Sequence, residues 1–398
     1  MVTASSKTKR GAASGRRSKS EGGKDETYHL TIGDLAREFN VTLRTLRFAQ
    51  VPGQAAVAGV VAVGALLVKD MLHGNDRFAG SGGAAFTLGS AFLAVPLSAY
   101  MRRRGRRPGL VLAFLLGMIG AAVAGTAGQL RWLPLYLVGM VLFGGAQAAT
   151  LQGRYVAADL APDHDRARAI ASVVVVGTLG AVFGPVLTPH EQRLGIALGL
   201  DEYVGPYFVA VVFLLCSAAI VTRWLRPDPL HVNGELDPNA TRVRPLRQIR
   251  ASYAAIRVSH LAPLGLLAMV ISQAAMTSVM TMTPSHMKDH GNGSLSAYVI
   301  ALHIAGMYAF APFVGRFVGW AGKVRAVMVG AVVLGLGTVV AVVAGYVPSL
   351  IFVGLFLLGV GWNIGLIAGS AILTGAVPAE SRVEVQGAAD LTLSGRDS

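Results

Sequence analysis

Residues 101–109, with the sequence MRRRGRRPG, decide the fold of this chain. They place five arginines between two apolar runs, at residues 83–100 and 110–130. An arginine at the centre of a bilayer opposes insertion by roughly 2.5–3.5 kcal/mol, so these side chains must lie in water and the chain must turn there. Basic connections between spans stay on the cytoplasmic side. The stretch therefore predicts a cytoplasmic turn between two spanning helices, and it sets the direction of every other span.

The overall composition also indicates a membrane protein. The chain has 398 residues, of which 53% are hydrophobic and 14% are charged, and its mean hydropathy is +0.55. An ordinary soluble domain is about 25% charged. Most of the net charge of +14 comes from the first 50 residues and from short loops, so it requires no nucleic-acid ligand. A single cysteine, Cys216, excludes an intrachain disulfide framework.

Ten apolar segments approach the roughly 20 residues that a spanning helix needs. They lie at residues 51–72, 83–100, 110–130, 133–151, 170–187, 204–224, 261–282, 295–314, 326–346 and 350–373. With the arginine turn in the cytoplasm, alternation puts most other loop arginines on that side. The opposite side receives few basic residues: Arg77, Arg131, Arg193 and Lys288, with Lys69 near the boundary. This asymmetry supports ten spans and places both termini in the cytoplasm.

One long polar connection, at residues 226–259, divides the spans into six and four. The sequence therefore predicts an all-α polytopic membrane bundle. Its parts are a six-helix N-terminal bundle, a cytoplasmic central loop, an incomplete four-span bundle and a polar C-terminal segment, at residues 51–225, 226–259, 260–374 and 375–398. The pattern resembles a twelve-span protein that lacks its last two spans. Residues 1–27 are expected to form a disordered basic tail, because they hold almost no apolar residues.

Residues 28–50 predict two short helices separated by a turn at residues 40–41. Thr31 and Asp34 fit a capping box, and a second helix follows the turn. The string TIGDLAREFNVTLRTLRF at residues 31–48 resembles the start of the MerR family of transcription regulators, whose second helix enters the DNA major groove. That resemblance implies four DNA-facing positions: Thr42, Arg44, Thr45 and Arg47. It ends where the family's further helices would follow, so nucleic acid is not the favoured partner.

Residues 98–107 resemble the loop between spans two and three of the major facilitator superfamily of secondary transporters. That loop ends in a glycine and two basic residues, here Gly105, Arg106 and Arg107. Arg102 stands where the family has an aspartate, and Ser98 where it has a leading glycine. Residues 315–323 form a fainter copy after the eighth span, as duplication of one half predicts.

Residues 154–166 resemble the superfamily's loop after span four, and they include Asp159 and Arg166. Asp159 is expected to face the arginine turn across the cytoplasmic side. It either helps to close that side as a gate or makes an ordinary exposed ion pair, which contributes little stability.

Residues 180–185 match the GxxxGP core of a motif found in the superfamily's exporters. Gly177, Gly180 and Gly184 clear one face of the fifth span for a neighbouring helix, and Pro185 weakens the helix just after them. The match favours export. Packing of small residues without any role in export is the alternative.

Seven residues in the later spans are candidates to line a cavity near the middle of the membrane: Gln273, Met276, Met280, His303, Tyr308, Trp362 and Asn363. No acidic residue lies near mid-membrane in the predicted spans, so His303 is the candidate proton carrier. A neutral, hydrogen-bonded histidine is the alternative. For the methionines the alternative is core packing.

The resemblance to the superfamily implies alternating access by a multi-pass protein of the plasma (inner) membrane, with efflux of small amphiphilic molecules and a coupling proton. No nucleotide-binding loop, HExxH or GxSxG signature is present, so we expect no enzyme activity, no cofactor and no metal site. Two alternatives stay open. One is a membrane-tethered DNA-binding regulator, and the other is a truncated membrane protein that transports nothing.

Overall fold

The computed structural model describes residues 32–394 except for residues 74–77, 79, 160, 163, 235, 237–244, 290–295 and 346. Over this described part the chain forms helices and no strand. Nine of the described helices are long and apolar enough to cross a membrane. The predicted all-α polytopic membrane fold is therefore confirmed. The tail predicted at residues 1–27 lies outside the described residues.

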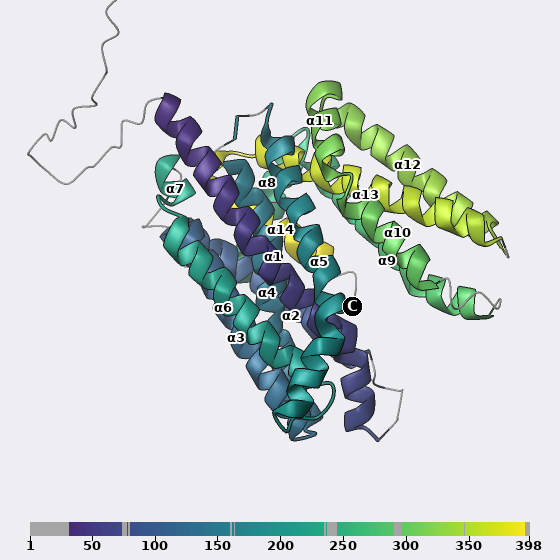
Figure 1. The fold of residues 1–398 in the computed structure, drawn as a ribbon. Helices are drawn as coiled ribbons and strands as arrows, with labels where there is room; N and C mark the ends of the chain where they lie inside the picture. Colours follow the sequence, from purple (N-terminus) through teal and green to yellow (C-terminus); the bar gives the residue numbers. More distant parts are fainter. Residues whose placement is uncertain are drawn as a thin grey trace, which may run out of the picture.

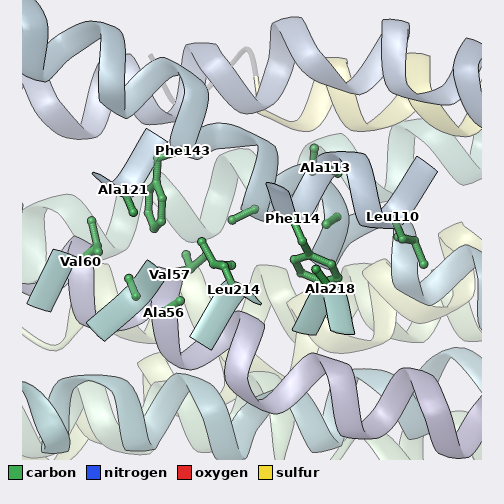
Figure 2. Close-up of a cluster of buried hydrophobic side chains, with 14 of the residues drawn as sticks. Ala56, Val57, Val60, Leu110, Ala113, Phe114, Ala121, Phe143, Leu214 and Ala218 are labelled. Carbon is green, nitrogen blue, oxygen red and sulfur yellow. The ribbon is translucent and has the colours of Figure 1, made fainter. Parts of the chain in front are cut away.

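Six helices form the first half of the molecule and pack around one core. They are α1 (Ile32–Met71), α2 (Ser81–Arg104), α3 (Arg106–Gln129), α4 (Leu133–Asp159), α5 (Arg166–Ala197) and α6 (Gly205–Trp224). α1 lies against α5 and α6, while α4 lies against α2 and α3. Val60, Phe114, Phe143 and Leu214 meet in the core between these helices (Figure 2).

The second half follows two short helices, α7 (Pro229–Val232) and α8 (Pro245–Val258), which lie within the connection predicted as a loop. It consists of α9 (Ala262–Asp289), α10 (Ser296–Tyr308), α11 (Ala311–Ala321), α12 (Lys323–Val343), α13 (Pro348–Ala376) and α14 (Ala379–Ser394). α13 is central, since α9, α10 and α12 all pack against it. The predicted eighth span is divided into α10 and α11, because Pro312 starts a new helix in its first turn.

The two halves meet at the end of the molecule that carries residues 102–107, here termed the arginine end. At that end α14 packs against α2, and α11 packs against α5. The far ends of the two groups of helices are spread apart (Figure 1). The two halves are therefore held together at the arginine end.

The two helices predicted within residues 28–50 are not separate. α1 runs without a break from Ile32 through the turn predicted at residues 40–41 and on into the first span. Leu43 and Leu46 continue the apolar face of that span, so an uninterrupted helix buries them in the same core. The predicted turn is wrong for this reason.

The described part of the polar C-terminal segment predicted at residues 375–398 is a packed helix. Residues 379–394 form α14, which packs against α2 and α8 and buries Val383, Val385 and Ala389. A Cβ atom at Gly387 would overlap the Ser98 side chain of α2, so glycine allows the two helices to approach closely. Small residues on one face explain why a helix of low hydropathy is buried here.

Candidate functional site

A cavity of about 220 Å³ lies between the two halves. Residues from α1, α4 and α5 form one wall, and residues from α9, α10 and α13 form the other. The lining residues are Gln50, Gln54, Gln147, Thr150, Leu151, Arg154, Val173, Val174, Gln273, Met276, Met307, Tyr308, Trp362 and Leu366. Drug-sized ligands occupy pockets of roughly 300–1,000 Å³, so this cavity suits a smaller molecule.

The cavity wall combines amides with an aromatic pair. Four of its lining side chains are glutamines, which each offer both donors and an acceptor. The rings of Tyr308 and Trp362 meet edge to face, with centroids 5.7 Å apart. Trp362 Nε1 donates a hydrogen bond to Gln273 Oε1 at 3.0 Å, which fixes the indole in the wall. The arrangement can bind a small planar molecule with polar edges.

The structure brings four of the seven predicted cavity residues together: Gln273, Met276, Tyr308 and Trp362. His303 and Asn363 are fully buried away from the cavity lining. His303 Nδ1 lies 2.8 Å from the carbonyl oxygen of Leu355, as in the hydrogen-bonded alternative. Both polar atoms of the Asn363 amide are buried without a hydrogen-bond partner. The Met280 side chain lies outside the described residues.

Beside the cavity, toward the arginine end, a buried polar network joins α3 and α4 to α14. It consists of Arg106, Gln152, Arg154, Asp159, Gln386 and Asp390, and we refer to it as the polar network. Arg106 Nε donates to Asp159 Oδ2 at 2.8 Å and Nη2 donates to Oδ1 at 3.2 Å. Both side chains are 0% exposed, so the alternative of an exposed surface pair is wrong. A buried bidentate pair of this kind is stable only while both partners are present, because loss of one leaves the other as an unpaired buried charge.

The turn between α2 and α3 positions Arg106. Gly105 adopts a φ of 104°, which only glycine adopts readily, and a Cβ atom there would overlap the Asp228 carboxylate. Asp228 accepts hydrogen bonds from the backbone N–H groups of Arg106 and Arg107, at 3.1 and 2.7 Å. A carboxylate at a helix N-terminus is stabilising. The first turn of α3 is thereby fixed, and the Arg106 side chain enters the bundle.

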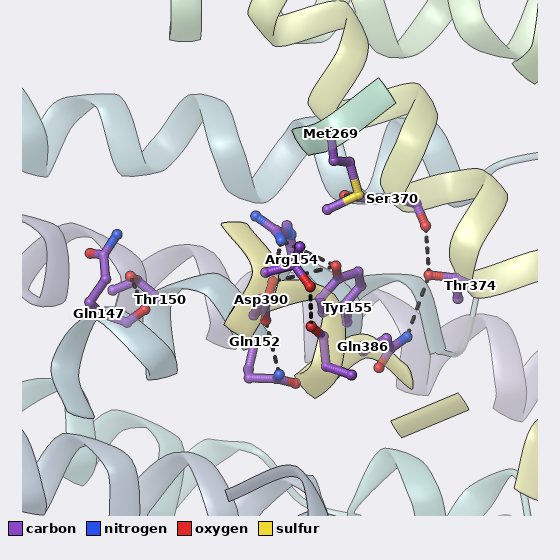
Figure 3. A network of polar contacts seen from close by, with 12 residues as sticks. Gln147, Thr150, Gln152, Arg154, Tyr155, Met269, Ser370, Thr374, Gln386 and Asp390 are labelled. Carbon is purple, nitrogen blue, oxygen red and sulfur yellow. Dashed lines mark hydrogen bonds and ion pairs between the residues drawn. The ribbon is translucent and has the colours of Figure 1, made fainter. Parts of the chain in front are cut away.

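Arg154 and Asp390 form the second buried ion pair of the polar network (Figure 3). Arg154 Nη2 donates to Asp390 Oδ1 at 2.5 Å, and Gln152 Nε2 donates to Asp390 Oδ2 at 3.0 Å. Gln152 also accepts from Arg106 at 3.1 Å, and Gln386 accepts from Arg106 at 2.5 Å. One continuous set of hydrogen bonds therefore runs from the arginine turn to the cavity wall, where Arg154 lies.

Sequence reasoning missed the carboxylates of this region. Asp390 in α14 and Glu191 in α5 are 1% and 7% exposed, and both lie beyond the ends of the predicted spans, where no buried acidic residue was expected. Arg154, assigned to a loop, lies within α4 and is buried. A signal was present at Gln386 and Asp390, which stand one helical turn apart in a run of small and apolar residues.

The substitution of the superfamily's aspartate by Arg102 has a counterpart in α14. Arg102 Nη1 lies 2.6 Å from Glu384 Oε1, and the two side chains are 24% and 13% exposed. The contact between α2 and α14 therefore includes an ion pair, with the cation on α2. Arg166, also predicted from the loop motifs, is the first residue of α5.

The glycines of the predicted packing motif face α1. A Cβ atom at Gly184 would lie 2.6 Å from the carbonyl oxygen of Ala55. A Cβ atom at Gly180 would overlap the carbonyl oxygen of Val51. Gly177 faces Gln50 of the same helix, and Pro185 lies inside α5. The structure thus places this motif in a close contact between α1 and α5. α1 also supplies Gln50 and Gln54 to the cavity.

Two of the four predicted DNA-facing positions are not on the surface. Thr42 and Thr45 are 3% and 4% exposed, and the Thr45 hydroxyl lies 3.4 Å from the carbonyl oxygen of Trp224 in α6. Arg44 is exposed and Arg47 is half-buried. The prediction is wrong for the two threonines, because α1 packs this face against α6.

Comparison with known proteins agrees with this geometry. The Major Facilitator Superfamily profile matches residues 51–395. An uncharacterized MFS-type transporter of Bacillus subtilis (strain 168), YddS, is 36% identical over 359 residues, which are 89% of this chain and 82% of the relative. The riboflavin transporter RfnT of Brucella anthropi is 28% identical over 376 residues, with 92% and 88% of the two chains covered.

Solved structures show the same fold. The crystal structure of the human organic anion transporter MFSD10 (TETRAN) superposes with a TM-score of 0.75 at 16% identity, covering 90% of this chain and 91% of that one. Together, the profile match, the relatives and the helical arrangement show that the chain is a membrane transporter of the major facilitator type, and so belongs to the major facilitator superfamily.

Proposed function

We propose that this protein moves small organic molecules across the plasma (inner) membrane by alternating access. The observation that carries the proposal is the position of the cavity, whose two walls come from the two halves of the molecule. A site at the interface of two halves can be exposed to either side when the halves rock against each other. The arginine end, where the halves meet, is the cytoplasmic end in this proposal, as the distribution of basic loops predicts.

We further propose that the polar network holds the cytoplasmic side closed. Arg106 and Asp159 lie in the first half, and Gln386 and Asp390 lie in α14 of the second. Opening this side must break the hydrogen bonds between them. The GxxxGP core at residues 180–185 supports efflux as the direction of transport.

Transport is tested with the full chain in proteoliposomes. Riboflavin is the first solute, because a relative carries the name of a riboflavin transporter. We expect riboflavin or a smaller aromatic solute to exchange faster than in protein-free liposomes, and Trp362→Ala to slow the exchange at least tenfold. If the protein exports its solute, everted membrane vesicles, whose cytoplasmic face points outward, should take up the solute when they are energised. Absence of exchange for every solute tested would contradict the proposal.

The described part of the leading segment does not favour the regulator alternative, because two of its DNA-facing positions are packed inside the protein. A gel-shift measurement with the full chain in detergent provides the check, and we expect no retardation of DNA at low salt.

A further inference from the structure

We propose that the cavity takes a small aromatic anion and that Arg154 binds its anionic group. This inference deepens the transport function proposed above and rests on it. Three observations carry it: the unused donor of Arg154, the charges of the cavity wall, and the aromatic pair opposite.

Arg154 has a donor to spare. Its side chain lines the cavity although it is only 4% exposed. The Nη2 atom donates to Asp390 and to the hydroxyl of Tyr155, at 2.5 and 3.1 Å. The Nε atom is buried and has no hydrogen-bond partner. A guanidinium offers five N–H donors in a rigid plane that matches a carboxylate, so the Arg154 side chain in the cavity wall suits an anionic group that enters the cavity.

The cavity wall carries one charge. Among the lining residues that the structure describes, Arg154 is the single ionised side chain, since the others are amides, a hydroxyl, aliphatic groups and aromatic rings. Asp390 lies behind Arg154 on α14 and does not line the cavity. A ligand in the cavity therefore meets a cation and no carboxylate among the described lining residues. This arrangement excludes cationic ligands more strongly than neutral ones and favours anions.

The rest of the wall suits one planar ring. Tyr308 and Trp362 present aromatic surfaces, and Met276 and Met307 present polarisable apolar ones. The volume of about 220 Å³ is below the range of drug-sized pockets. A single-ring aromatic carboxylate combines the required size, planarity and charge.

The same residue connects the ligand to the polar network. An anion bound to Arg154 competes with Asp390 for one guanidinium, so it weakens a contact that joins α4 to α14. Binding of the substrate is therefore unfavourable while Asp390 holds Arg154. Removal of the Asp390 charge should strengthen anion binding even though it weakens the contact between the halves.

The probes are benzoate and benzamide, which share a ring and differ in charge, measured by calorimetry on the full chain in nanodiscs. We expect benzoate to bind at least tenfold more tightly than benzamide. Arg154→Gln should abolish this preference, Arg154→Lys should retain part of it, and Asp390→Asn should tighten benzoate binding at least threefold. The control is Arg168→Gln, which removes an exposed arginine paired with Asp165 and away from the cavity lining.

Equal binding of the two probes, or binding of neither, overturns the inference. The benzoate preference of the unaltered chain decides the matter even if Arg154→Gln fails to fold. Looser benzoate binding by Asp390→Asn overturns the competition with Asp390. Riboflavin exchange by the same preparation separates the two proposals. Exchange without a preference for benzoate leaves transport standing and removes the anion. A benzoate preference without exchange of any solute leaves the anion site standing and removes transport.

Discussion

The two halves of this transporter meet along two seams at the arginine end, and the seams differ in chemistry. In the apolar seam, Ala311, Val314 and Val318 of α11 pack with Ala167 and Ala171 of α5. The other, polar seam consists of the polar network and the Arg102–Glu384 pair, between α2, α3 and α4 on one side and α14 on the other.

The difference teaches how such a gate can have two states. Apolar burial is roughly proportional to the area removed from water, so the apolar seam loses stability gradually as it opens. A buried ion pair is stable only when every partner is in place, because an unpaired buried charge is strongly destabilising. The polar seam therefore favours either full closure or full hydration. The apolar seam supplies closure that is independent of charge.

The largest expected effect comes from breaking the centre of the polar seam. Arg106→Gln removes the hydrogen bond to Gln386 of α14 and leaves Asp159 buried without its cation while the seam is closed, which destabilises the closed arrangement by roughly 3–5 kcal/mol. We expect spin labels at residues 224 and 320, whose native tryptophans are 56% and 85% exposed, to move apart in a Cys216→Ser background. Double electron–electron resonance measures the distance. An unchanged distance distribution would show that the polar seam does not hold this end closed.

A smaller effect is expected from overpacking the apolar seam. A Cβ atom at Gly315 of α11 would already lie 2.7 Å from the Cβ of Ala171 in α5. Gly315→Leu should destabilise closure by about 1–3 kcal/mol, the usual result of extra volume in a packed contact. The matched control is Gly335→Leu, since Gly335 has open space around it. The same label pair should report opening that is independent of salt, in contrast to changes at the partly exposed Arg102–Glu384 pair of the polar seam. Equal opening by Gly315→Leu and Gly335→Leu would contradict this prediction.

The contrast between the seams also separates what the sequence could predict from what it could not. Apolar periodicity and the basic turn were sufficient for the all-α membrane fold, because a bilayer allows backbone groups to be satisfied only within helices or closed barrels. The cavity residues Gln273 and Trp362 could be predicted because polar and indole groups stand out in an apolar run. Those signals lie within single helices.

The polar seam depends on pairs of helices, and one sequence does not show which helices pair. Asp390 stands 236 residues from Arg154, in a helix whose low hydropathy concealed its burial. Gln50 was assigned to a leading fragment, although α1 carries it to the cavity wall. The sequence showed residues capable of pairing, but their partners were fixed by packing of the two halves.

The smallest effect is expected at the edge of the polar seam. Arg102 and Glu384 are partly exposed, so their pair should contribute only about 0–1 kcal/mol. Arg102→Gln should widen the label distance slightly at low salt and not at all at 1 M salt, where the Debye length is about 3 Å. The exchange Arg102→Glu with Glu384→Arg should restore the low-salt distance. If Arg102→Gln opened this end as far as Arg106→Gln, the exposed edge of the polar seam, and not its buried centre, would stabilise the closed arrangement.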